Sequence, residues 1–295
     1  MVGVAFGAVV AAGVAGLVFR CARRARSRVP REPHRLRGSS THLDELISCI
    51  HRVGSAPDAQ QTAAECLSSV SLASDSALQA LQALAGKAEG VRGMQGRGPA
   101  GRALVAKLGH VLCAALAALS RAAREHGFAS AEAYRSAVEK VRGRTPYMAE
   151  WGDGSVASRP AEAMALWQAR KAAQKAAAAP EPSAAKHLDS APGDLLFTVA
   201  RLTAPGGCPW TATHTAEALL KFLKEECTEA VEELDALAAT NGGPAGSERT
   251  DKLRTALISE LGDVLFDVFM AIFIAARDHS FEAADVFHCA ATEVL

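Results

Sequence analysis

Apolar residues recur at spacings of three and four along most of the chain from His42 onward, with polar residues between them. This period is that of amphipathic α-helices, and the sequence has few aromatic residues and only short β-branched runs. The pattern therefore predicts an all-α fold. Stretches rich in glycine and proline interrupt it near residues 86–102, 151–160, 176–194 and 241–247.

Two parts of the chain carry the same helical pattern. Residues 104–138 align without a gap with 257–291, and 61–84 align with 214–237. Features such as "LG-VL" and "AAR-H-F" recur at matching offsets, which an alanine-rich composition alone does not produce. The alignment predicts two tandem copies of one helical unit, which pair as an intramolecular pseudo-dimer.

The predicted organisation has four parts. A first helical unit over 41–148 and a second over 195–295 are joined by residues 149–194. The joining part holds one long helix over 161–176, in which Trp167 is the expected packing anchor, followed by a flexible linker. Residues 1–40 differ from all of these.

The N-terminal segment is apolar and then basic. Residues 2–19 are uninterrupted by charge, and an Arg-rich stretch follows with no acid before Glu32. The run is close to the shortest length that spans a bilayer, and the basic flank predicts an anchor that leaves the rest of the chain in the cytosol. A cleaved secretory segment and a presequence for an organelle, mitochondrion or plastid, are the alternatives, and the sequence leaves them open.

Charge and cysteine content exclude two classes of function. Lys and Arg together number 32, as do Asp and Glu, and no basic stripe with interleaved aromatic residues is present, so no nucleic-acid partner is expected. The 7 cysteines are scattered without CxxC or Cys/His spacing, which argues against a zinc site and a disulfide framework.

Acidic residues stand out in the second unit. Residues 258–276 are almost entirely apolar but carry Glu260, Asp263 and Asp267 on one helical stripe, and the helix over 219–237 carries Glu226 and Glu229 beside its apolar face. A short break between the two helices predicts an antiparallel pair with facing acidic stripes. Buried carboxylates either raise their pKa or bind cations, and oxygen ligands select Mg²⁺ or Mn²⁺. The alternative is a pair of solvated acidic faces.

The order E-x-x-E at Glu226 and Glu229, then E-x-x-D at Glu260 and Asp263, with "GGCPW" ahead and "ELGDVLFDV" around the second pair, resembles the MazG family. The resemblance covers Phe197 to Val286. It implies a dimer of four-helix units that hydrolyses nucleoside triphosphates, NTPs or dNTPs, to the monophosphate and diphosphate with Mg²⁺, as in nucleotide-pool sanitation.

The resemblance also implies roles for individual residues. Four acids would be metal ligands for two divalent ions, and Glu225 would orient or deprotonate the attacking water. Asp267 would lie behind the ligands or be a further ligand. The implied ligands are Glu226, Glu229, Glu260 and Asp263.

The substrate contacts are less fixed by the resemblance. The family commonly has an acid and Gln-Thr-His after the tryptophan, whereas this chain has Thr211 and then His214 to Ala216, so the preferred base stays open. Trp210 would stack on the base and His214 would contact the substrate; packing and a helix-start role are the alternatives.

The first unit lacks the acids. At the corresponding positions it has Ala73, Ser76, Lys107 and His110, so it is predicted to be catalytically inactive. It keeps a basic segment that resembles the one after the last helix in the family, and the second unit has none before Leu295. These cations are predicted to reach a triphosphate bound at the second unit, or else to cap a helix C-terminus: Lys140, Arg142 and Arg144.

Two functions of different classes follow. The leading one is a Mg²⁺-dependent nucleoside triphosphate pyrophosphohydrolase, favoured by the retained acids. The other is a non-catalytic, membrane-associated helical interaction protein with a residual acidic site, favoured by the loss of acids from the first unit. The sequence leaves open the preferred nucleotide and whether the pseudo-dimer assembles into a homo-oligomer.

Overall fold

The computed structural model describes residues 41–50, 61–85, 98–176, 191–240 and 247–294. Within these ranges all regular structure is helical, which confirms the predicted all-α fold. They all belong to one compact unit, Gly38–Leu295. The segment over 1–40, predicted to be a membrane anchor or a targeting segment, lies outside the described residues. Both interpretations of it therefore remain predictions.

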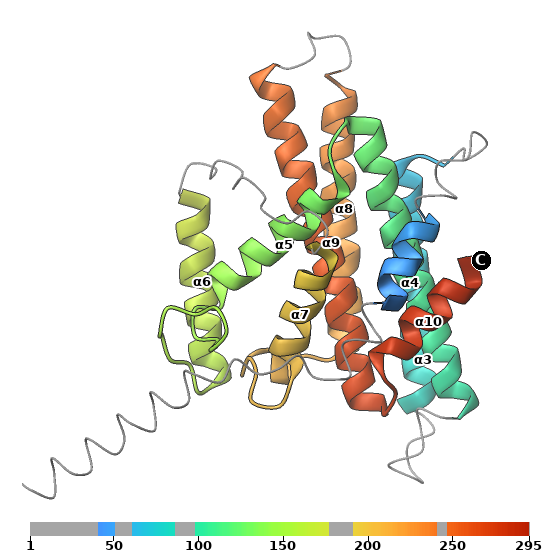
Figure 1. Cartoon of the computed structure of the whole chain (residues 1–295), viewed down its shortest axis with the longest axis vertical. Coiled ribbons are helices and arrows are strands. Elements are labelled where there is room, and N and C mark those ends of the chain that lie inside the picture. The colour runs from blue at the N-terminus through green and yellow to red at the C-terminus, as the bar shows by residue number, and fades with distance from the viewer. Residues whose placement is uncertain (1–40, 51–60, 86–97, 177–190, 241–246, 295) are drawn as a thin grey trace, which may run out of the picture. The chain divides into compact units, whose positions relative to one another are not determined.

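The helices follow one another along the chain as labelled in Figure 1. Residues 41–50 are helical and precede the labelled elements. The others are α3 Ala63–Ala85, α4 Pro99–His126, α5 Ser130–Arg144, α6 Pro160–Ala176, α7 Ala191–Thr203, the 3₁₀ helix η3 Thr211–Thr213, α8 Ala216–Ala238, α9 Glu248–His279 and α10 Ala283–Val294.

Proline at helix starts makes two predicted breaks shorter than expected. α4 begins at Pro99, directly after its N-cap Gly98, and α7 begins at Ala191 with Pro192 in its first turn. Proline is tolerated there because the first helical N–H groups have no partner within the helix. The predicted linker over 176–194 therefore extends too far, because residues 191–194 form the first turn of α7. The helix predicted over 161–176 is confirmed as α6.

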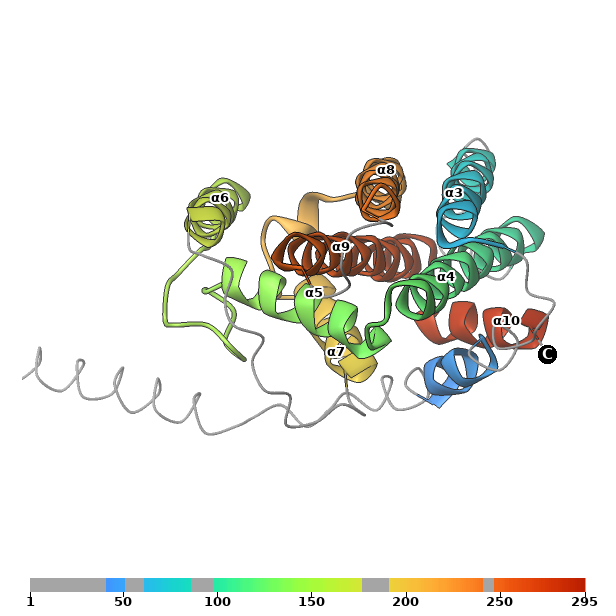
Figure 2. The same cartoon turned by 90° about the horizontal axis from the view of Figure 1, so that it is seen from above.

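The helices lie in three layers. Figure 2 shows α3 and α8 along one side of the long helices α4 and α9, and α5, α7 and α10 along the other. α3 packs against α4, α8 against α9, and α3 also packs against α8. α9 is the central element, and residues from Leu257 to Ala275 on its apolar face are buried.

The helix that ends each half packs on the long helix of the other half. α5 follows α4 in the chain but packs on α9, and α10 follows α9 but packs mainly on α4. Glycine at position 262 permits the crossing of α5 over α9. A Cβ added to Gly262 of α9 would lie 2.8 Å from the carbonyl oxygen of Ala133 and 3.2 Å from the nitrogen of Ala137, both on α5.

The reciprocal crossing involves the equivalent residues. A Cβ added to Gly109 of α4 would lie 3.4 Å from the backbone nitrogen of Ala290 on α10. In the alignment of 104–138 with 257–291, Gly109 corresponds to Gly262 and Ala290 corresponds to Ala137. This reciprocity supports the interpretation of two paired copies, which remains a prediction, as do the unit boundaries.

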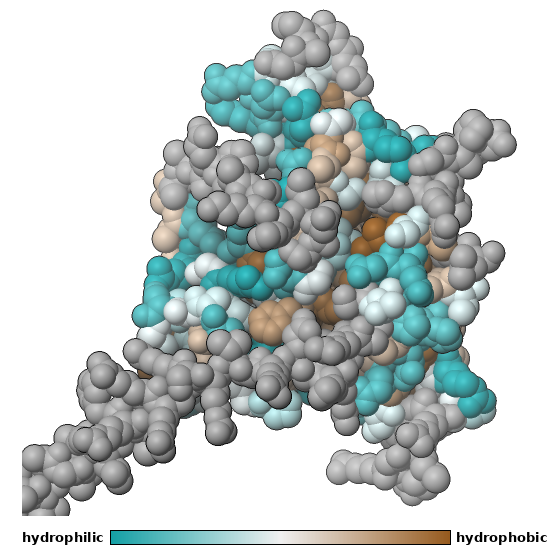
Figure 3. Space-filling view, in the orientation of Figure 1, coloured by the Kyte–Doolittle hydropathy of each residue, from teal (hydrophilic) through white to brown (hydrophobic). Residues whose placement is uncertain are grey.

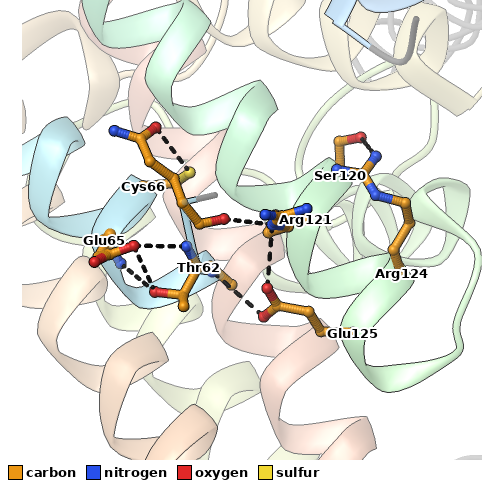
Figure 4. Close-up of polar contacts among 9 residues, drawn as sticks. Thr62, Glu65, Cys66, Ser120, Arg121, Arg124 and Glu125 are labelled. Atoms are coloured by element: carbon orange, nitrogen blue, oxygen red, sulfur yellow. Dashed lines mark hydrogen bonds and ion pairs between the residues drawn. The ribbon is translucent and has the colours of Figure 1, made fainter. Parts of the chain in front are cut away.

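Hydrogen bonds at the start of the first helix stabilise each of the two helical hairpins, α3 with α4 and α8 with α9. In the first half, shown in Figure 4, the backbone nitrogen of Thr62 donates to the carboxylate of Glu65 at 2.7 Å, and Arg121 donates to the carbonyl of Gln61. In the second half, Thr215 caps α8 by accepting from the nitrogen of Ala218, and Arg277 donates to the carbonyl of His214 at 2.9 Å. Gln61 and His214 are equivalent in the alignment, so both halves tie the same backbone position to their long helix.

Among the described residues, α4 alone is long and apolar enough to cross a membrane, and 56% of its most apolar stretch is buried inside the protein. Leu104, Leu108 and Leu112 on this helix are fully buried. The apolar length of α4 is thus explained by its place in the core. In the space-filling view of Figure 3, hydrophilic residues predominate near the edges of the described surface, and apolar residues gather toward the middle.

Candidate metal centre and active site

Three carboxylates from α8 and α9 converge. One carboxylate oxygen from each of Glu226, Glu229 and Glu260 lies within 4.8 Å of the other two, and within the part of the chain that the structure describes no other such acidic group is found. Glu226 and Glu229 share a face of α8 because they are three residues apart. Glu229 is exposed and the other two are partly buried. The predicted facing of the two acidic stripes holds for these three residues.

Asp263 is held by a lysine from the first half of the chain. Lys140 on α5 places its Nζ 2.5 Å from the Oδ2 of Asp263 and donates to the carbonyl of Ser259 at 3.3 Å. The two ionic side chains are 14% and 22% exposed, so the pair is mostly shielded from water. The fourth predicted ligand therefore already has a cationic partner.

Crowding of negative charge changes the pKa values of the cluster. The pKa of Glu226 is raised to about 7, mainly by burial and in addition by the negative charges of Asp263, Glu229 and Glu260. Burial also raises the pKa of Glu260, an effect that Lys140 opposes. The pKa of Asp267 is raised well above its ordinary value by burial and by Glu226, which favours its neutral form. The cluster lacks sufficient positive charge, a deficit that a bound cation would correct.

The raised pKa values predict an unusual pH dependence without metal. Because the folded state binds the proton of Glu226 more tightly than the unfolded state, the contribution of this group to stability is fully present below about pH 4.5 and is lost as pH rises through about 7. The melting temperature in EDTA should fall by a few degrees between about pH 5 and pH 7.5. Excess Mg²⁺ should remove most of this fall, because the ion stabilises the ionised carboxylates.

Glu226→Gln provides the control for this pH dependence, since an amide does not titrate. In EDTA, its melting temperature should change less between the same two pH values than that of the wild-type protein. An equal fall in both proteins would contradict the assignment of the effect to this carboxyl group.

Arg144 lies beside the acids. Burial lowers the pKa of its guanidinium, and Asp263, Glu226 and Glu260 counteract this, in that order of strength. Its Nε donates to the Oε1 of Gln174 on α6 at 2.8 Å, and its guanidinium carbon lies 5.3 Å from the ring centroid of Trp167. Arg144 is thus a cation within electrostatic reach of the acidic cluster, and two residues of α6 contact it.

Aromatic rings continue from Arg144 to the start of α8. The ring centroids of Trp167 and Trp210 are 5.2 Å apart, and Trp210 meets His214 edge-on at 4.7 Å. The Nδ1 of His214 also lies 3.0 Å from the carbonyl oxygen of Trp210. Trp167 and Gln174 of α6 thus both contact Arg144. The sequence predicted only a packing role for Trp167, because no sequence spacing relates α6 to the acidic residues.

Arg142 of α5 contacts α7 and Trp151. Its Nε donates to the Oγ1 of Thr198 at 3.0 Å, its Nη2 lies 3.7 Å from the Oδ1 of Asp194, and its guanidinium carbon lies 5.4 Å from the ring centroid of Trp151. Glu225 is exposed on α8 next to Glu226. That Arg142 contacts a bound triphosphate and that Glu225 orients or deprotonates the attacking water both remain predictions.

Residues 214–292 match the model of the MazG nucleotide pyrophosphohydrolase domain. This segment is a MazG domain. It contains α8, α9, most of α10 and all four predicted acidic ligands. The resemblance predicted from the sequence is confirmed for the second unit, whereas the first unit lies outside the match and its interpretation as a degenerate copy stays a prediction.

Two relatives each match about a third of the chain. "Uncharacterized protein YabN" from Bacillus subtilis is 33% identical over 88 residues, which are 30% of this chain and 15% of that protein. "Nucleoside triphosphate pyrophosphohydrolase/pyrophosphatase MazG" from Thermotoga maritima is 32% identical over 93 residues, 32% of this chain and 31% of that protein. The chain thus matches less than a third of the length of either relative. No solved structure significantly matches it.

The site extends beyond the MazG domain. Lys140 of α5 is paired with Asp263, and Arg144 of α5 lies within electrostatic reach of the acids. Both residues lie outside 214–292, as does Trp167 of α6, which contacts Arg144. The MazG domain supplies the carboxylates, and the first half of the chain supplies cations beside them.

Proposed function

We propose that the protein is a Mg²⁺-dependent nucleoside triphosphate pyrophosphohydrolase, which converts an NTP or dNTP and water to the monophosphate and diphosphate, with a role in nucleotide-pool sanitation. The convergence of Glu226, Glu229 and Glu260 inside a MazG domain carries this proposal. The relative from Thermotoga maritima, whose name describes this activity, supports it.

The acids fit a hard divalent cation. All donors are carboxylate oxygens, which suit Mg²⁺ or Mn²⁺. The raised pKa values of Glu226 and Glu260 are consistent with a site that positive charge would stabilise. Glu226, Glu229 and Glu260 would hold the ion, while Asp263, the fourth ligand implied by the resemblance, is paired with Lys140. A bound Mg²⁺ would supply charge stabilisation at the phosphoryl oxygens.

The remaining chemistry falls to side chains of the chain. Glu225 would orient or deprotonate the water whose oxygen attacks the α-phosphorus, and the bond from that phosphorus to the bridging oxygen breaks, so that diphosphate leaves. Asp267, kept neutral by its raised pKa, would add no negative charge near the incoming phosphates. Arg144 would bind the phosphates beside the acids.

Arg144 and Arg142 should contribute differently to substrate binding. Arg144→Ala is expected to raise KM at least several-fold, because it removes a cation next to the cluster. Arg142→Ala removes a cation that is engaged with Thr198 and Trp151, so its KM should rise less. Steady-state kinetics with the preferred nucleotide measure both, and an unchanged KM in Arg144→Ala would contradict its assignment.

The function is tested with the full chain in detergent micelles, incubated with Mg²⁺ and a panel of NTPs and dNTPs. Release of diphosphate and the monophosphate, abolished by EDTA, is the expected result. Release of orthophosphate would indicate a different cleavage position. If no nucleotide is cleaved, the non-catalytic interaction protein becomes the better description.

A further inference from the structure

We propose that the ammonium group of Lys140 replaces one of the two divalent cations implied by the family resemblance, so that the nucleotide-free protein binds a single divalent ion on Glu226, Glu229 and Glu260. The inference rests on the proposed function, since it concerns the metal of that same site. It starts from the contact between Lys140 and Asp263.

The lysine is held firmly on the acid. Its Nζ has two acceptors on α9, the Oδ2 of Asp263 at 2.5 Å and the carbonyl of Ser259 at 3.3 Å, and its side chain is only 14% exposed. Surface lysines rarely keep one partner, because ordering the long side chain costs entropy. A mostly buried ammonium with two acceptors is instead a fixed positive charge of the site.

The crossing of α5 and α9 sets this position. Gly262, next to Asp263, allows the backbone of α5 to approach so closely that an added Cβ would lie 3.2 Å from the nitrogen of Ala137. Lys140 is three residues after Ala137 and so lies on the same face of α5. The close approach at Gly262 thus brings Lys140 onto Asp263.

One divalent ion, not two, suits the remaining acids. Paired-metal sites hold ions about 3.5–4 Å apart through several shared ligands, and Mg²⁺ commonly takes only one or two carboxylates and completes its shell with water. The Oδ2 of Asp263 is occupied by the ammonium, which leaves three converging carboxylates for one ion. A second cation at Asp263 would also be repelled by Lys140.

The net charge of the site also favours one bound divalent ion. Glu226, Glu229, Glu260 and Asp263 carry four negative charges when ionised, and Lys140 and Arg144 carry two positive charges beside them. One divalent ion makes this set neutral, whereas a second would leave it doubly positive. Any further ion would therefore arrive with the nucleotide.

The test is a titration of MnCl₂ into the metal-stripped full chain without nucleotide, followed by calorimetry and by the electron paramagnetic resonance signal of free Mn²⁺. The wild-type protein should bind one ion per chain. Lys140→Met should bind two, because Asp263 is released, and Lys140→Arg, which keeps the charge, should bind one. Lys171→Met, at an exposed position of α6, is the control and should bind one.

Asp263→Asn tests the same point without removing the lysine. It should still bind one ion, with an affinity within a few-fold of the wild-type value, whereas Glu229→Gln should lose the ion. Two ions on the wild-type protein, or loss of the ion from Asp263→Asn, would overturn the inference and leave the proposed function standing. No ion on the wild-type protein would overturn both.

Discussion

Glu229→Gln is expected to reduce diphosphate release by more than about 100-fold, since even residues that only support metal ligands typically contribute 10–100-fold. Glu229 is one of the three converging carboxylates and the one exposed to solvent, where a substrate-bearing ion would enter. The amide keeps the shape of the side chain but loses its charge. Initial rates at saturating Mg²⁺ and nucleotide, with Mn²⁺ affinity measured in parallel, test this expectation.

Glu232→Gln is the matched control for Glu229→Gln. Glu232 is also exposed on α8, but it is not among the converging carboxylates. Its substitution removes the same charge from the same helix and should leave the rate within about twofold, as is usual for exposed sites. Equal losses in both variants would show that the net charge of α8 matters and not a metal ligand.

Gly262→Ala is expected to destabilise the protein by about 1–3 kcal/mol, the usual cost of overpacking. Its Cβ would meet the carbonyl oxygen of Ala133 at 2.8 Å, and because that atom belongs to the backbone, α5 must move away from α9. The expected fall in melting temperature is about 2–4 °C per kcal/mol. Thermal unfolding in EDTA measures it without a contribution from bound metal.

Gly109→Ala is the control at the equivalent position of α4. Its Cβ would lie 3.4 Å from the nitrogen of Ala290, an ordinary contact, so no helix needs to move. Alanine should instead stabilise α4 by up to about 1 kcal/mol through its higher helix propensity. If Gly262→Ala were no less stable than Gly109→Ala, the close crossing of α5 and α9 would not be a feature of the folded protein.

Local pattern was enough to predict most of the helices and the acidic cluster. Glu226 and Glu229 share a face through the helical period alone, and so do Glu260 and Asp263. A short connection between α8 and α9 then requires an antiparallel pair, which brings the two stripes together. The same period predicted α6, from Pro160 to Ala176, almost to the residue.

The helical spacing of apolar and polar residues could not predict contacts between helices that are distant in the sequence. The pairing of Lys140 with Asp263 was not predicted, because it depends on a crossing of α5 and α9 that the glycine at 262 permits. The predicted role of Lys140 at a triphosphate stays a prediction. The association of Arg144 with Trp167 likewise depends on how α6 folds back, for which no spacing gives a signal. The starts of α4 and α7 were misjudged because proline ends a helix in its interior but is accepted in the first turn.

The reciprocal crossing of α5 and α10 has a consequence for the history of the chain. If the two halves arose by duplication, the half without acids could lose its own chemistry and still be retained by selection, because its Lys140 pairs with Asp263 of the other half and its Arg144 lies within electrostatic reach of the acids. A cut between the halves would deprive the acids of these cations and uncover the surface of α9 around Gly262. The two halves are therefore expected to be inherited and regulated as one piece.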